Sequence, residues 1–175
     1  MRLFAFGLGY SAQRIVDRLG AGAASGTART PEAAEALRRS GIEAFVFDGV
    51  RGDPALTPGL ARAQALLVST PPQPSGDPAH RAFAREIAAA PELRRILYLS
   101  TIGVYGDWGG AWIDEGSATR TAAPRGRWRL AAEAQWRALA AARGVPLDIL
   151  AAEPPAGPGL LLYGRALAGA MAAAP

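Results

Sequence analysis

The chain has 175 residues, a formal net charge of +4 and 50% hydrophobic residues, which suit one globular domain with a sizeable core. It contains no cysteine and a single histidine, His80, so disulfides, thiolate catalysis and metal sites built from cysteine or several histidines are excluded. All 19 basic residues are arginines, and the lack of lysine also excludes Schiff-base chemistry.

The first twenty residues predict a strand, a glycine turn and a helix. The apolar run at residues 3–6 leads into G-x-G-x-x-A, and apolar residues then return at helical spacing. Gly7 permits the tight turn, Gly9 lets a phosphate approach the backbone, and Ala12 lets the helix pack closely on the sheet. Tyr10 and Ser11 begin the helix, whose free N–H groups and positive dipole end would face an anion. These five residues are expected to bind a dinucleotide, and a turn that serves packing alone is the alternative.

The second strand indicates which dinucleotide is bound. NAD sites usually place a carboxylate about 20 residues after the glycines, but here the first carboxylate is Glu32. Arg29, with the hydroxyls of Ser25, Thr27 and Thr30, resembles a pocket for a 2′-phosphate instead. We therefore expect NADP, with NAD as the second choice. The alternative is that Arg29 is a solvated surface arginine.

Strand and helix patterns alternate along the rest of the chain. Strands are expected over Gly22–Ala28, Ala44–Asp48, Ala65–Ser69, Arg95–Ser100 and Pro146–Leu150, and helices over Pro31–Ser40, Ala79–Ala89 and Pro124–Arg143. Such alternation predicts an α/β fold, a Rossmann-like doubly wound parallel sheet in three α/β/α layers. Residues 1–150 would form the NAD(P)-binding domain, and 151–175 a divergent apolar tail without a separate substrate domain.

Ligands of such sheets bind at the carboxyl ends of the strands. Asp48 ends a strand there and could accept a hydrogen bond from an adenine amine or serve as a turn former. Ser69, Thr70 and Pro71 could lie alongside the cofactor's ribose and nicotinamide. The alternative is that they form a rigid proline loop. We expect these segments, the glycine turn, Arg29 and residues 100–101 to line one crevice.

The segment Tyr98–Asp107, YLSTIGVYGD, resembles the strand end and Val-Tyr-Gly turn of the NAD(P)-dependent epimerase/dehydratase family, the extended and atypical short-chain dehydrogenase/reductases. With the glycine turn and Arg129–Glu133, the resemblance covers roughly residues 1–150. It implies that Thr101 holds the position of the family's catalytic Ser/Thr and that Ser100 lies next to the cofactor. It also implies a small-molecule substrate with a hydroxyl group, such as a nucleotide sugar.

The chain departs from this family at the proton-transfer pair, a tyrosine followed four residues later by a lysine. The resemblance places Arg125 at the tyrosine position and Arg129 at the lysine position. Arg129 could still hold the cofactor ribose, but Arg125 cannot replace a phenol as a base near neutral pH. Tyr105 is a candidate acid in the crevice, and its alternative role is that of a packed turn aromatic.

These features leave two candidate functions open. The first is hydride transfer by an oxidoreductase or epimerase, and the second is a catalytically silent NADP(H)-binding or sensor module; a shortened relic of the fold is a third reading. Arg120, Arg125, Arg127, Arg129 and Arg137 could face an anionic substrate or form a solvated face.

The sequence also predicts the binding partners and the cellular location of the protein. The arginines are scattered among acids and do not predict nucleic-acid binding, and no apolar run reaches the ~18 residues of a membrane span. The chain starts in its first strand without a leader, which predicts a cytoplasmic protein. The apolar tail could cover the sheet edge, meet a second subunit in a homodimer, or be poorly ordered.

Overall fold

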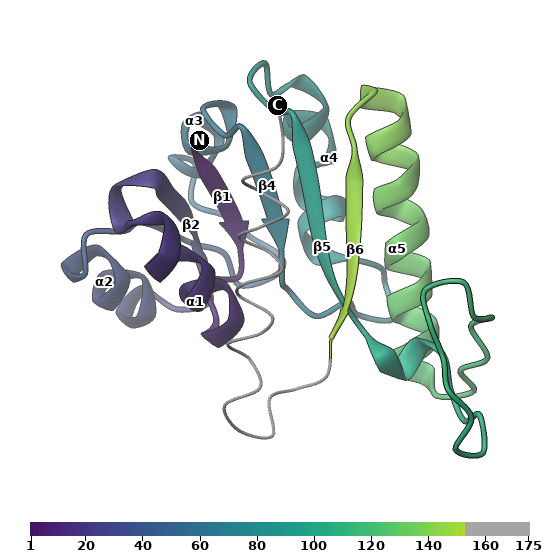
Figure 1. The fold of residues 1–175 in the computed structure, drawn as a ribbon. Coiled ribbons are helices and arrows are strands. Elements are labelled where there is room, and N and C mark those ends of the chain that lie inside the picture. Colours follow the sequence, from purple (N-terminus) through teal and green to yellow (C-terminus); the bar gives the residue numbers. More distant parts are fainter. Residues whose placement is uncertain (153–175) are drawn as a thin grey trace.

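A computed structural model describes residues 1–152, which form one parallel six-stranded sheet in the order β3-β2-β1-β4-β5-β6 (Figure 1). The strands are β1 (Leu3–Phe6), β2 (Ala24–Ala28), β3 (Glu43–Val46), β4 (Ala65–Val68), β5 (Arg95–Thr101) and β6 (Leu147–Ala152). The helices are α1 (Tyr10–Leu19), α2 (Pro31–Arg39), α3 (Leu56–Ala61), α4 (Pro78–Ala89) and α5 (Pro124–Arg143), with single 3-10 turns η1 (Ala21–Ala23) and η2 (Ile102–Val104). The expected doubly wound α/β fold is confirmed.

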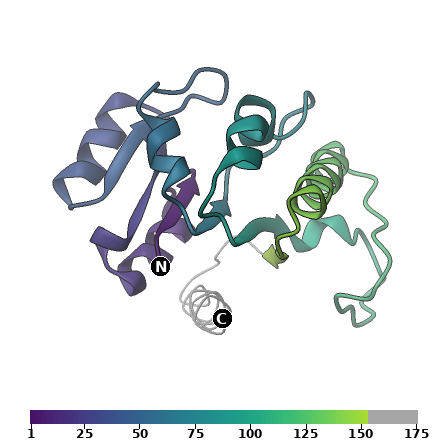
Figure 2. The same ribbon diagram turned by 90° about the horizontal axis from the view of Figure 1, so that it is seen from above.

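Helices cover both faces of the sheet, so the core has two halves. Ile15 of α1 and Leu37 of α2 pack on one face. Leu60 of α3, Phe83 of α4 and Trp136 of α5 pack on the other, and Figure 2 shows α4 and α5 on the same side of the sheet. Burial on both faces explains why β1 and β4 read as continuous apolar runs.

Local signals in the sequence set most of the helix ends. Thr30 accepts a hydrogen bond from the Ala33 N–H and precedes a proline at the start of α2, while Asp77 caps α4 in the same way through the His80 N–H. Gly144, in the left-handed conformation, ends α5. These are ordinary capping devices, and the predicted bounds of α5 match the observed ones.

Some expectations need correction. The segment Ala21–Ala23 is the turn η1, so β2 starts later than predicted, and α3 was not predicted. His80 lies in the first turn of α4, and its ring meets Trp136 edge to face with centroids 5.3 Å apart. Strand β6 continues to Ala152, and the rest of the predicted tail lies outside the described residues. In the described part of the chain, no helix has the length and apolar character that crossing a membrane requires.

Candidate functional site

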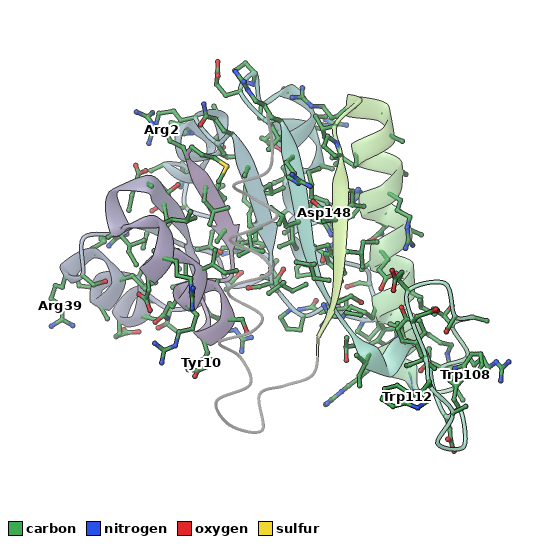
Figure 3. All side chains as sticks on the ribbon, viewed as in Figure 1. Arg2, Tyr10, Arg39, Trp108, Trp112 and Asp148 are labelled. Atoms are coloured by element: carbon green, nitrogen blue, oxygen red, sulfur yellow. The ribbon has the colours of Figure 1, made fainter. Side chains whose placement is uncertain are left out.

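Two adjoining clefts open at the carboxyl ends of the strands, and both are lined by Gly9, Ser69, Pro71 and Gln73. The β2 cleft, about 760 Å³, lies among the glycine turn after β1 and the segments that follow β2 and β3. The α5 cleft, about 1020 Å³, lies among the start of α1, the end of β5 and the first turns of α5. Figure 3 labels Tyr10, which lines the α5 cleft, at this edge of the sheet. The five segments predicted to meet are brought together here.

Gly7 is required by the protein itself. Its φ is +86°, and a Cβ there would lie 3.0 Å from Ser69 Oγ. The Gly7 N–H donates to Thr27 Oγ1 at 2.9 Å, and the Ser69 hydroxyl donates to the Gly7 carbonyl at 2.5 Å. The turn is therefore held by the strands on both sides of β1.

Gly9 is different: it is the N-cap residue of α1, where glycine is tolerated well, but no neighbouring atom requires a residue without a side chain. Its φ is −80°, which any residue adopts, and a Cβ built on it meets no atom within 4 Å. It faces both clefts and precedes α1, which has no side-chain cap and no acidic residue in its first turn. The unpaired N–H groups of a helix start next to open space form an anion site that only a residue without a Cβ leaves fully accessible.

The other residues of the turn divide by position. Tyr10 and Ser11 line the α5 cleft. Ala12 lines neither cleft; it is fully buried in the core between α1 and the sheet, as its predicted packing role requires.

Arg29 lines the β2 cleft with an exposed side chain, and of the three hydroxyl residues expected beside it only Thr27 also lines this cleft. Thr27 holds the Gly7 N–H and Thr30 caps α2. Ser25 lines a separate pocket with Arg2, away from the glycine turn. Thr27 therefore stays at the cleft with Arg29, with its Oγ1 accepting from the Gly7 N–H, whereas Ser25 and Thr30 do not line this cleft.

Asp48 lines the β2 cleft and also organises its own turn. Its Oδ1 accepts hydrogen bonds from the N–H groups of Val50 and Arg51, both at 2.7 Å, and these bonds lower the pKa of the carboxyl. Thr70 lines the same cleft, and its buried hydroxyl has no hydrogen-bond partner among the described residues.

At the end of β5, successive side chains serve different purposes. Thr101 lines the α5 cleft, and its Oγ1 accepts a hydrogen bond from the Gly103 N–H at 3.2 Å. Ser100 also borders the cleft, but its hydroxyl donates to the buried carboxylate of Glu133 on α5. Glu133, which also receives Arg137 Nη2 at 3.3 Å, is a structural partner that sequence reasoning missed.

Arg129 is fixed against β5. Its Nη1 donates to the Leu99 carbonyl at 2.8 Å and to the Tyr98 hydroxyl at 3.2 Å. Tyr98 is fully buried, and this burial raises the pKa of its phenol above the ordinary value. Arg129 thus lines the α5 cleft from a defined position.

Tyr105 is not among the residues that line either cleft. Its carbonyl accepts hydrogen bonds from Trp108 Nε1 and from the Arg120 N–H, each at 3.1 Å. It therefore belongs to the base of the loop at residues 106–121, which carries Trp108 and Trp112 away from the sheet (Figure 3). These bonds involve the Tyr105 backbone and not its phenol, so the acid and the packed turn aromatic both stay predictions.

The basic run around the start of α5 separates into distinct roles. Arg120 stacks over the Trp108 ring at 3.7 Å, Arg127 donates to the Ala122 carbonyl, and Arg137 pairs with Glu133. Only Arg125 and Arg129 of this run line the α5 cleft, together with Trp128. Their i, i+3 and i+4 spacing on one helix face was the signal available in the sequence. Within residues 1–152, no three His, Asp or Glu side chains are grouped as metal ligands.

The chain is similar to several solved structures. A functionally unknown conserved protein from Silicibacter pomeroyi is 32% identical, with a TM-score of 0.81, over 99% of this chain and 69% of that protein. A UDP-glucuronic acid 4-epimerase from Bacillus cereus, in complex with a fluorinated UDP-glucuronic acid and NAD, is 16% identical with a TM-score of 0.64, over 85% of this chain and 55% of the epimerase. A short-chain dehydrogenase/reductase superfamily protein from Agrobacterium tumefaciens with bound NAD is 18% identical with a TM-score of 0.65, over 86% of this chain and 48% of that protein.

The last two similarities, at low identity, concern the fold, and this chain spans about half the length of those proteins. No protein-family model matches the chain, and a search of curated proteins gives no significant match.

Proposed function

We propose that this chain, which belongs to the same family as the conserved protein of unknown function from Silicibacter pomeroyi, binds a nicotinamide dinucleotide across the two clefts. The observation that carries the proposal is Gly9, the one residue of the turn whose missing side chain faces open space rather than protein. A pyrophosphate placed there would meet the helix start of α1. The NAD bound to two proteins with this fold supports the same ligand class.

The adenosine half fits the β2 cleft and the nicotinamide half fits the α5 cleft, since the glycine turn lies between them. Arg29 is the cation of the β2 cleft, and its guanidinium makes no ion pair or hydrogen bond with another described residue. A guanidinium there favours a 2′-phosphate, so we propose NADP in preference to NAD.

If the protein is an enzyme, the nicotinamide would exchange a hydride with a carbinol or carbonyl carbon of a substrate in the α5 cleft. Thr101 would orient the substrate hydroxyl, and Arg129 would lie beside the cofactor ribose. Both side chains line this cleft and are held there by the backbone of β5 or the turn that follows it.

The second candidate is a catalytically silent dinucleotide-binding or sensor module. Arg125 and Arg129 stand where the resembled family has tyrosine and lysine, and Tyr105 lies outside both clefts. Neither arginine can donate a proton near neutral pH. This observation favours binding without chemistry.

The binding proposal is tested by titrating purified protein with NADPH and with NADH while nicotinamide fluorescence is recorded. We expect saturable binding that is at least about tenfold weaker in Gly9→Val. Gly22→Val is the matched control, because Gly22 also has open space at its Cβ and lies at the opposite edge of the sheet. Arg29→Ala should weaken NADPH more than NADH, whereas Arg39→Ala, an exposed arginine outside the clefts, should change neither. Absence of binding, or equal losses in Gly9→Val and Gly22→Val, would overturn the proposal.

The enzyme and the silent module differ in turnover. Oxidation of NADPH that depends on an added carbonyl compound supports the enzyme, and Tyr105→Phe then tests the predicted acid: loss of turnover at unchanged NADPH affinity would support it, and unchanged turnover would remove it. Tight NADPH binding without turnover on any member of a broad carbonyl panel favours the silent module.

A further inference from the structure

The α5 cleft has a marked imbalance of charge. Among the residues that line it, Arg125 and Arg129 are cationic and none is an aspartate or glutamate. The buried carboxylate of Glu133, which does not line the cleft, is already bound to Ser100 and Arg137. The cleft wall therefore presents uncompensated positive charge.

Arg125 contributes most of the positive charge that is free to bind an anion. It is exposed, and its guanidinium makes no hydrogen bond or ion pair with another residue of 1–152. Arg129 uses Nη1 on the Leu99 carbonyl and the Tyr98 hydroxyl, which leaves its other N–H groups available. The two guanidinium groups follow each other by one helical turn and line the same cleft.

The position of Arg125 is unfavourable for the free protein. It is the second residue of α5, whose first turn contains no acid, so a cation lies at the positive end of the helix dipole. An anion bound in the cleft would relieve this repulsion. The cleft, the two guanidinium groups and the missing carboxylates all favour the same kind of ligand.

We propose that Arg125, with Arg129 beside it, binds the acid group of a small anionic substrate, a carboxylate or a phosphate, in the α5 cleft. The assignment of this anion as a substrate rests on the proposed dinucleotide site. A planar guanidinium fork binds either acid in a bidentate manner. A volume of about 1020 Å³ leaves room for a small organic acid next to the nicotinamide end of a cofactor. Arg125 thus serves recognition at the position where the resembled family has its proton donor.

The experiment is isothermal titration calorimetry with malonate and, separately, with inorganic phosphate, on protein alone and on protein saturated with NADPH. Wild type should bind at least one probe saturably in both states, and Arg125→Gln should bind it at least about tenfold more weakly. Arg127→Gln is the matched control. It removes the same charge two residues along the helix, and the Arg127 side chain does not line the cleft. Arg125→Lys should recover part of the affinity, because it restores the charge without the fork.

Equal weakening in Arg125→Gln and Arg127→Gln, or no saturable binding of either probe, would overturn the inference, provided that thermal melting shows both variants folded. Malonate preference would indicate a carboxylate substrate and phosphate preference a phosphorylated one. If NADPH binds and the probes do not, only this inference fails. If the probes bind in the Arg125-dependent way and NADPH does not, the dinucleotide proposal fails and the acid site stands.

Discussion

The hydroxyl of Ser100, near the end of β5, donates a hydrogen bond to the buried carboxylate of Glu133 on α5, with 2.5 Å between Oγ and Oε1. Glu133 is only 4% exposed, and the one other hydrogen bond to its carboxylate in the described part of the chain comes from Arg137. This bond ties the strand that carries Thr101 to the helix that carries Arg125 and Arg129.

Ser100→Ala should therefore affect stability more than ligand binding. The change leaves a buried carboxylate oxygen without its donor, which costs about 1–3 kcal/mol of unfolding free energy. Urea denaturation measures this loss. In a double-mutant cycle with Glu133→Gln, the two changes in unfolding free energy should be strongly non-additive. A variant of wild-type stability with much weaker NADPH binding would instead favour direct contact with the cofactor, the role that the family resemblance implies.

The position of Arg129 should depend on Tyr98. Arg129→Ala leaves the fully buried Tyr98 hydroxyl without its partner and should cost about 1–3 kcal/mol of unfolding free energy. Tyr98→Phe should cost less, about 1 kcal/mol, because Arg129 keeps its bond to the Leu99 carbonyl. A double-mutant cycle followed by urea denaturation measures the coupling. Strictly additive losses would mean that the hydroxyl and the guanidinium do not interact.

Two glycines near the turn should respond very differently to substitution by alanine. A Cβ at Gly26 would lie 2.3 Å from the Ala5 carbonyl oxygen, where β2 passes β1, whereas a Cβ at Gly9 meets nothing. Gly26→Ala should lower the unfolding free energy by about 1–3 kcal/mol through overpacking. Gly9→Ala should change it by less than about 1 kcal/mol, because the lower entropy of the unfolded chain is opposed by the poorer N-cap that alanine makes for α1. Thermal melting compares them, and a strongly destabilised Gly9→Ala would assign Gly9 to packing.

The sequence predicts the sheet because strand runs and capping signals are local. Pro31 and Pro124 begin helices where expected. Strand β1 coincides with the apolar run at residues 3–6. Helix α3 escaped prediction because its six residues include a proline and a glycine. That helix depends on tertiary contacts: Leu56 and Leu60 are fully buried.

The candidate site was predictable where the backbone dictates it and less so where side chains choose between partners. The glycine turn and its cleft follow from the spacing of the glycines and the carboxyl-end rule. Whether Thr27 faces a ligand or the Gly7 N–H depends on neighbouring strands that only the folded chain brings together. The same is true of Arg125, which differs from Arg127 only in the helix face that it occupies.

Asp77 should give the stability a distinctive pH dependence. Its carboxyl is fully buried, and burial raises its pKa above the ordinary 3.8, against the opposing effects of the His80 N–H and the Trp136 indole. The indole lies near enough to lower the pKa, although Asp77 Oδ2 and Trp136 Nε1 do not meet at hydrogen-bonding geometry. Between 3.8 and the raised value the folded protein holds more protons than the unfolded one, so this group lowers the stability as the pH rises through that window.

Asp77→Asn removes this loss and keeps an oxygen to cap the His80 N–H. The unfolding free energy of the variant minus that of wild type should therefore increase with pH from about 4 upward, measured by urea denaturation at several pH values. His80, whose pKa burial lowers, has the opposite slope, but it is present in both proteins. In Asp77→Asn the loss of the Asp77 charge lowers the pKa of His80 further. This change also makes the free-energy difference between variant and wild type increase with pH. A difference that is flat or falls with pH would show that Asp77 is not desolvated in the folded protein.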